Sequence, residues 1–404
     1  MIDLRPFRAW RPSPDKAHLV GSRSYISYSK EELADKLAGN PYTFLHVIHP
    51  EEISHHPGSR MDRFHRIRNA FKGFCDEGFL ERDAAPCIYV YEQRSRGILS
   101  RGIIAGVNIA AYRDGRIKVH EQTLTARENL FSEYLAHTGI NAEPVLLSTP
   151  EGSDWQRLLE PIAATRPDQD FSTTDRVRHR LWAVTDDLVR VQLQEAFARI
   201  PALYIADGHH RLASSARLAE SSGAGDVDPQ AWCLAFIVPK PDLHIYNFDR
   251  AITTLGWTKE DELLDGLASV GSVRKEEGPV SAPGVIGVRT RTGWHSVTLP
   301  PSDALEPSAR LDAARLSELI LGPLLRITDL RSDPRVKFVP GADGPQVLER
   351  MVMTGQAEAA FHLYPVSFEE LQAVADVGGT MPPKSTYIEP KLRSGLVVYS
   401  LEDV

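Results

Sequence analysis

The stretch "ALYIADGHHRLASSARLAE" (202–220) decides how the chain around it folds. Its first five residues are apolar and predict a short buried strand. Beyond a polar "DGHHR", Leu212, Ala216 and Ala219 recur at helical spacing and predict a helix that begins near residue 209. The polar residues therefore lie at a corner where a strand gives way to a helix.

This corner has the chemistry of an anion site. The first turn of a helix presents unpaired backbone N–H groups and the positive end of the helix dipole, which together favour a phosphate. Gly208 lets an anion approach the backbone, and His209, His210 and Arg211 add donors, Arg being able to hold a phosphate through two bonds. Asp207 can either cap the helix or hold a divalent cation such as Mg²⁺. Neither GxxxxGK[ST] nor a strand-to-helix GxGxxG occurs.

Outward from the corner, strand and helix patterns alternate. "RLWAV", "ALYIA" and "AWCLAFIV" are typical of strands, and "DDLVRVQLQEAFARI" and "HHRLASSARLAES" of helices. This alternation predicts an α/β fold, of the mixed α+β kind, with a parallel or mixed sheet.

The remaining patterns suggest three segments in the 404 residues. We expect an N-terminal α/β extension (1–115), a catalytic core (116–245) and a C-terminal α/β segment (246–404) that completes the substrate pocket. Local expectations include a helix over 30–39 capped by Ser29, a helix over 61–79, and strands over 97–112 and 116–123. The polar stretch 151–175 predicts a surface excursion with one short helix.

Composition restricts the function classes. Lys and Arg total 46 against 54 Asp and Glu, a net charge of −8, which argues against a nucleic-acid partner. No apolar run approaches the roughly 18 residues of a membrane span, and the start lacks a signal-peptide core, so a cytoplasmic protein is expected. The three cysteines show no CxxC spacing, which favours a reducing compartment and no zinc site.

Three further stretches carry candidate chemistry. Glu121 in "KVHEQT" could accept the proton of an alcohol during phosphoryl transfer, although a lone Glu there is more often a surface residue. Lys384, Ser385 and Thr386 in "PPKSTYIEPK" suit a carboxylate or a phosphate, and by composition form a surface loop. Asn247 and Arg250 in "IYNFDR", expected to be exposed after a strand, either line the pocket or serve at the surface. The His-rich "HPEEISHHPGSR" (49–60) fits no usual metal-ligand spacing and is expected to be a solvated loop.

The motifs "HEQT" (120–123), "ADGHHR" (206–211) and "PPKST" (382–386) resemble the DUF1015 family, which is related to ParB and sulfiredoxin folds. "NPYTFLHVIHPE" (40–51), "YEQ" (91–93) and "HRLW" (179–182) also fit, so the resemblance covers most of the chain. The same motif order is similar to shorter archaeal free L-serine kinases. Full-length relatives of about this size resemble pyrophosphate-dependent serine kinases.

This resemblance implies a ParB/sulfiredoxin-like core and a kinase that converts free L-serine to O-phospho-L-serine with Mg²⁺. It implies that Glu121 accepts the hydroxyl proton and that Asp207 supports catalysis or the metal. It also implies that Gly208 to Arg211 hold the donor phosphates and that Lys384, Ser385 and Thr386 surround the amino acid. The kinase pattern has a His where this chain has Ile388. As a separate hypothesis from the sequence itself, the arginines of the N-terminal arm supply extra positive charge for pyrophosphate (Arg5, Arg8, Arg11 and Arg23).

Several alternatives stay open at this point. ADP or ATP can replace pyrophosphate as the donor, and the acceptor alcohol and the oligomeric state are not determined by the sequence. A ParB-like, nucleotide-gated DNA-binding protein needs a basic helix-turn-helix, which we do not find. A sulfiredoxin-type reductase needs a cysteine in the phosphate-binding motif, where this chain has His209.

Overall fold

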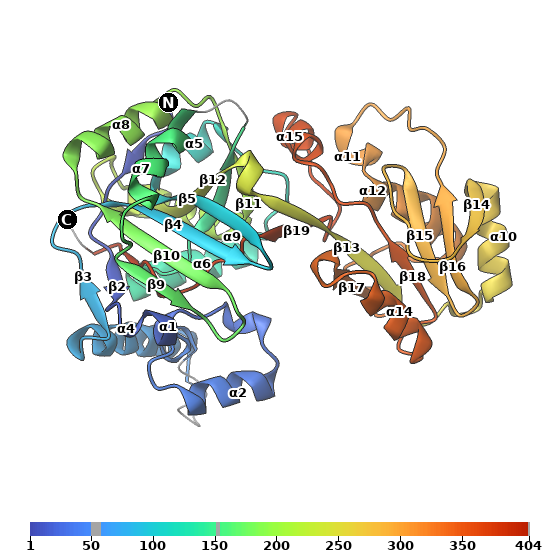
Figure 1. Cartoon of the computed structure of the whole chain (residues 1–404), viewed down its shortest axis with the longest axis horizontal. Helices are drawn as coiled ribbons and strands as arrows, with labels where there is room; N and C mark the ends of the chain where they lie inside the picture. The colour runs from blue at the N-terminus through green and yellow to red at the C-terminus, as the bar shows by residue number, and fades with distance from the viewer. Residues whose placement is uncertain (50–57, 151–153, 403–404) are drawn as a thin grey trace. The chain divides into compact units, whose positions relative to one another are not determined.

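The computed structural model describes residues 1–49, 58–150 and 154–402 (Figure 1). The chain forms two compact units. Unit 1 comprises Met1–Lys118, Gln122–Leu243 and Pro390–Val404, and unit 2 comprises Val119–Glu121 and His244–Glu389. The three-segment division expected from the sequence stays a prediction. Across the described ranges, no helix combines the length and the apolar character that crossing a bilayer requires.

Unit 1 is built on a mixed sheet, so the predicted α/β class is confirmed. The strand order is β6-β11-β8-β12-β5-β4-β10-β9, and β1 pairs with β5. The pairs β6–β11 and β8–β12 are parallel and the others are antiparallel. The strands are β1 (Leu4–Arg5), β4 (Ile88–Ser95), β5 (Ile98–Asn108), β6 (Ile117–Lys118), β8 (Val145–Thr149), β9 (Gln169–Ser172), β10 (Arg178–Val184), β11 (Leu203–Asp207) and β12 (Trp232–Pro239).

The apolar run of β12 explains its central place in this sheet. Every residue from Cys233 to Val238 is fully buried, and β12 lies between β5 and β8. A strand covered on both faces has no polar alternation, which is why the run is continuous in sequence.

Helices surround the sheet of unit 1. Helix α9 packs against α5 and α6 and against strands β8 and β12, whereas α7 packs on β4 and β10. Two small ladders, β2–β3 and β7–β20, complete the unit. These elements are α1 (Ala17–Val20), η1 (Tyr25–Ser27), α2 (Lys30–Gly39), α3 (Leu45–Ile48), α4 (Arg60–Asp76), α5 (Ile109–Arg113), α6 (Thr125–Thr138), η3 (Asp154–Leu158), α7 (Leu159–Ala163), α8 (Asp187–Ala198), α9 (His209–Ser221), η4 (Pro229–Ala231), η5 (Lys240–Asp242), β2 (Trp10–Pro12), β3 (Leu80–Arg82), β7 (Ile140–Asn141) and β20 (Tyr399–Ser400).

Local sequence signals predict where helices begin, but they do not predict strand boundaries that depend on pairing with another strand. Ser29 caps α2 through a capping box with Glu32, as predicted. The expected strand over 97–112 stops at Asn108, whose side chain accepts from the N–H of Ala110 at 2.7 Å and caps α5. The expected strand over 116–123 is limited to β6. The surface excursion expected over 151–175 was wrong for its last part, because β9 forms there by antiparallel pairing with β10.

Unit 2 has a sheet of its own, and its described strand pairs are antiparallel. The order is β14-β16-β15-β18-β13-β17, and β19 pairs with the first half of β13. The strands are β13 (His244–Ile252), β14 (Ser272–Glu276), β15 (Val285–Thr290), β16 (Gly293–Thr298), β17 (Val336–Pro340), β18 (Ala359–His362) and β19 (Thr386–Glu389).

Successive side chains along the strands of this sheet point to opposite faces, and each face packs into its own hydrophobic core. Ile252 and Phe361 join a core with the helices that include α10, whereas Ala251 and Ala360 join a second core under α14. The helical segment from α12 to α13 contains a π turn, η6, directly before Gly322 and Pro323. Pro323 has no N–H to donate to the preceding turn, and such a gap accommodates a π turn. The helical elements are α10 (Glu260–Val270), α11 (Pro307–Arg310), α12 (Asp312–Leu316), η6 (Ser317–Leu321), α13 (Gly322–Leu325), η7 (Gly341–Asp343), α14 (Gln346–Met353) and α15 (Phe368–Asp376).

Candidate active site

Two parallel strands place the "HE" and "DGHHR" motifs at one sheet edge. Strand β6 pairs with β11 in parallel register, with Lys118 opposite Tyr204. The carboxyl ends of parallel neighbours point the same way, so the residues that follow each strand emerge side by side. His120 and Glu121 come two and three residues after Lys118, the end of β6, and the chain re-enters unit 1 at Gln122.

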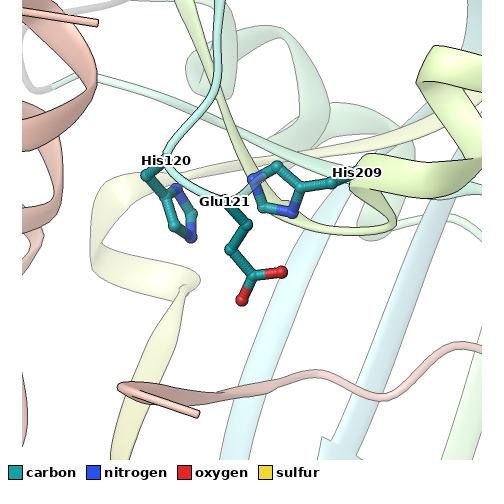
Figure 2. A group of neighbouring side chains, drawn as sticks. All are labelled: His120, Glu121 and His209. Carbon is teal, nitrogen blue, oxygen red and sulfur yellow. The ribbon is translucent and has the colours of Figure 1, made fainter. Parts of the chain in front are cut away.

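His120, Glu121 and His209 form a close group (Figure 2). One nitrogen of each imidazole and one carboxylate oxygen lie within 4.8 Å of one another. Both histidines are buried, with 1% of His120 and 5% of His209 exposed, whereas Glu121 is exposed. The arrangement presents a carboxylate to solvent beside two imidazoles, and the same ligand types are able to hold a divalent metal ion.

Gly208 makes the turn between β11 and α9 possible. It is the N-cap residue of α9 and has a φ of 99°, a region that side chains disfavour. A Cβ at this position would lie 2.8 Å from Nε of Arg211. The alternative that Asp207 caps the helix was wrong, because the N-cap residue is Gly208. The carboxylate of Asp207 instead faces two cations, Arg211 and Lys391.

Those two cations set the charge of Asp207. Nζ of Lys391 lies 3.6 Å and a terminal nitrogen of Arg211 lies 3.4 Å from its carboxylate. Desolvation raises the pKa of Asp207, but the charges of Lys391 and Arg211 outweigh this effect and bring the pKa below its ordinary value. The carboxylate is therefore ionised at neutral pH, and 45% of the side chain is exposed. Lys391 was not identified from the sequence, although it lies within the quoted "PPKSTYIEPK".

Arg211 is held by the protein itself. Its guanidinium lies 2.7 Å from the carboxylate of Glu143 and donates to the carbonyl of Pro144 at 2.7 Å. Burial lowers the pKa of Arg211, but Glu143 and Asp207 reverse this, so the pKa is raised. The side chain consequently braces the corner as well as adding positive charge to it.

His210 stands in the first turn of α9. Burial, and then the charge of Arg127, lowers the pKa of this imidazole, so it is neutral at physiological pH. In the part of the chain that the structure describes, its Nδ1 is buried and has no hydrogen-bond partner. A neutral ring with an unused nitrogen is able to bond a ligand.

Asn247 and Arg250 are not exposed and do not follow a strand, so that expectation was wrong. Both lie inside β13, with 4% and 0% of their surface exposed. Arg250 donates to the carbonyl of Phe248 at 2.7 Å and to that of Lys384 at 3.0 Å. Burial lowers the pKa of Arg250 to about 10, and Asp249 opposes this shift. Its role is to hold the "PPKST" loop from inside the sheet.

That loop joins β13 through β19. Thr386 pairs with Asn247, and Ser385 is buried, with Oγ donating to the carbonyl of Pro382 at 2.8 Å. Lys384 is exposed, has a φ of 56°, and places Nζ 5.1 Å from the ring centre of Phe248. The structure thus brings the "IYNFDR" and "PPKST" stretches, both singled out in the sequence, together within unit 2.

Backbone contact also links this loop to the "HE" motif. The N–H of Met381, one residue before "PPKST", donates to the carbonyl oxygen of His120 at 2.9 Å. The bond fixes the main chain directly before Glu121.

The arginines of the N-terminal arm have partners within unit 1. Arg11 forms a bidentate pair with Asp83, and Arg23 lies 3.5 Å from Asp175. Arg5 and Arg8 donate to backbone carbonyls. These contacts give each arginine a structural role. The His-rich loop at 49–60 falls mostly on residues 50–57, outside the described residues.

Comparison with known proteins gives one family match. The family described as "Protein of unknown function (DUF1015)" matches residues 4–314. No curated protein matches the chain.

Several solved structures are similar to this chain. A free serine kinase in complex with AMP is 14% identical, with a TM-score of 0.38, and the match covers 74% of this chain and 92% of that one. A conserved hypothetical protein from Pyrococcus furiosus is 15% identical, with a TM-score of 0.37 and coverage of 74% and 96%. SbnI from Staphylococcus aureus, truncated at its C-terminus, is 12% identical, with a TM-score of 0.40 and coverage of 74% and 90%.

Proposed function

The chain belongs to the DUF1015 family, and within that family we propose that it is a small-molecule kinase. It transfers a phosphoryl group from pyrophosphate to the hydroxyl of free L-serine and gives O-phospho-L-serine and phosphate. The observation that supports this most is the exposed carboxylate of Glu121 beside His209, the first residue of α9.

In this proposal Glu121 acts as the general base. Its carboxylate orients the serine hydroxyl and accepts its proton while the oxygen attacks phosphorus, and phosphate leaves on the far side. The buried imidazoles of His120 and His209 lie beside this carboxylate, each with one nitrogen within 4.8 Å of a carboxylate oxygen.

The donor phosphates bind at the start of α9. Backbone N–H groups after Gly208, the neutral ring of His210 and the positive charges of Lys391 and Arg211 offset the negative charge of pyrophosphate. Asp207 offers an ionised and partly exposed carboxylate, the ligand type that Mg²⁺ takes, so it fits a magnesium site. Mg²⁺ bound with the donor supplies charge neutralisation for the transferring group.

The "PPKST" loop binds the amino acid. Lys384 and the hydroxyl of Thr386 suit the serine carboxylate, and Ser385 shapes the turn. Arg250 and Asn247 act through this loop as positioning residues, because both are buried within β13.

A donor panel tests the proposal. Purified protein, Mg²⁺ and L-serine are mixed with pyrophosphate, ADP or ATP in turn, and phosphoserine is measured by mass spectrometry. Phosphoserine with pyrophosphate is the expected result. Product with ADP or ATP alone would keep the kinase and replace the donor. No product with any donor, while L-threonine or glycerol is also unreactive, would refute the proposal.

A further inference from the structure

In unit 2 a serine hydroxyl, an imidazole and a carboxylate lie one after another, as in a serine nucleophile with its base and the carboxylate that orients the base. Oγ of Ser281 lies 3.3 Å from Nε2 of His362. Nδ1 of the same imidazole lies 3.1 Å from both carboxylate oxygens of Asp249. Asp249 is on β13 and His362 ends the neighbouring strand β18, whereas Ser281 precedes β15. None of the three has a part in the proposed kinase chemistry.

The hydrogen-bond partners of Asp249 fix the tautomer of His362. Asp249 is fully buried and accepts from the N–H of Leu363 at 3.0 Å and from the amide of Asn247. Because every partner donates to it, the carboxylate acts as an acceptor, and Nδ1 of His362 must carry the hydrogen. Nε2 then has a lone pair and accepts from the hydroxyl of Ser281. This is the arrangement in which an imidazole removes a proton from serine.

A glycine on the adjacent strand permits the close approach of Ser281. Gly287 of β15 pairs with His362. A Cβ at residue 287 would lie 2.5 Å from the carbonyl oxygen of Val280 and 3.2 Å from Cβ of His362. Only a glycine at residue 287 lets the backbone of Val280, next to Ser281, lie this close to β15.

A cavity lies beside the same chain segments. It has a volume of about 140 Å³, and its lining includes Pro283 and Gly284, two and three residues after Ser281, and Leu363, which follows His362. Ser281, His362 and Asp249 themselves are not part of the lining, which also contains apolar, charged and hydroxyl side chains (Leu311, Val366, Arg310, Asp312, Arg315, Glu370 and Ser385). The space is large enough for a short acyl group next to the segment that carries Ser281.

We infer that Ser281 is an activated nucleophile and that unit 2 hydrolyses esters of short carboxylic acids. The Ser281 oxygen bonds to the acyl carbon while its proton moves to Nε2 of His362. The bond from the acyl carbon to the ester oxygen breaks, and the leaving alcohol takes that proton. Water then attacks the acyl carbon and gives a proton to His362. The bond to the Ser281 oxygen breaks, the serine regains the proton, and the acid is released.

Covalent labelling tests this inference on the full chain. The protein is treated with a fluorophosphonate probe and with p-nitrophenyl acetate, and the modified peptide is identified by mass spectrometry. We expect an adduct at Ser281 and release of p-nitrophenol. His362→Gln should slow labelling by about 100-fold or more, the usual contribution of a general base.

The controls separate activation from exposure and from misfolding. Ser302 is exposed, and among the described residues its hydroxyl has a backbone N–H and no imidazole as its hydrogen-bond partner, so it should stay unlabelled. Ser281→Ala should abolish both signals with an unchanged circular dichroism spectrum. Gly287→Ala, which displaces the Ser281 segment, should slow labelling while Ser281 is still present. No adduct at Ser281, or equal labelling rates in wild type and His362→Gln, would overturn the inference.

Discussion

Glu121 is the exposed member of a group whose two histidines are buried. Glu121→Gln keeps the size of the side chain and removes its basicity, so we expect phosphoserine formation to fall by about 100-fold to 10,000-fold. The kcat measured by mass spectrometry should carry most of the loss, with the melting temperature unchanged.

A matched control for this variant is a glutamate near the C-terminal end of α9, the helix that begins with His209. Glu220→Gln changes an exposed carboxylate there and should leave kcat at the wild-type value. Full activity of Glu121→Gln would exclude Glu121 as the base.

Gly208 is required by its backbone conformation. Gly208→Ala should lower the free energy of unfolding by about 1–2 kcal/mol, because a φ of 99° disfavours a Cβ that would also meet Arg211. Urea denaturation measures this change. Gly73→Ala should instead raise the free energy of unfolding. Gly73 lies inside α4 with open space around it, so alanine should stabilise that helix by about 0.5–1 kcal/mol. Equal stability of both variants would contradict this account.

At the residue scale, the sequence predicted where a strand turns into a helix better than it predicted which side chains form ion pairs. The strand-to-helix corner at Gly208 follows from local spacing, and the structure places it where expected. Lys391 could not be identified, because its carboxylate partner Asp207 is 184 residues away and only the fold joins them. Arg250 was wrongly expected to be exposed, because its burial also depends on contacts that only the fold creates. A charged residue usually indicates the surface, but here it is buried to hold a loop through backbone carbonyls.

At the scale of one strand, β10 carries a buried histidine with a large effect on stability. Nδ1 of His179 lies 2.6 Å from the Tyr91 hydroxyl, and the ring is fully buried. Burial, with the charge of Arg393, lowers the pKa of His179 to about 3 from 6.5. The unfolded chain binds this proton below pH 6.5 and the folded chain does not. Stability should therefore fall by about 1.4 kcal/mol per pH unit as the pH drops from 6.5 toward 3.

Urea denaturation between pH 7.5 and 4.5 measures this slope. His179→Gln removes the titrating ring, so its slope should be smaller by about that amount, although the variant is less stable at pH 7.5. Identical slopes in the two proteins would show that His179 is not the source.

Elements were predictable from sequence where the signal is local or the burial complete. The capping box of α2 and the apolar run of β12 are of these kinds. Strand β9, "QDFS", was missed because its residues are polar and its register comes from the partner strand β10. The π turn at η6 was missed because helical periodicity does not show a shift of hydrogen-bond register.

At the scale of the whole molecule, net charge separates the kinase from a DNA-binding protein. With a net charge of −8, the chain should not shift plasmid DNA in a gel at about 150 mM salt, with or without added nucleotide. A shift that weakens steeply as salt rises would favour the ParB-like alternative.

The α/β class followed from alternating patterns, but the division into two units did not. The boundaries between units fall on either side of Val119–Glu121, between Leu243 and His244, and between Glu389 and Pro390. None of these places has a linker composition that a sequence pattern would mark. Within unit 2, the two ends of the long segment pair with each other as β13 and β19, with His244 opposite Glu389.

The order in which the two units occur along the chain has a consequence for synthesis on the ribosome. Unit 1 needs residues after 390, because β20 pairs with β7 and Lys391 faces Asp207. The sheet of unit 1 can therefore assemble early, but the corner at Gly208 stays incomplete until all of unit 2 has been translated. A nascent chain stalled before residue 390 would carry Asp207 without its lysine.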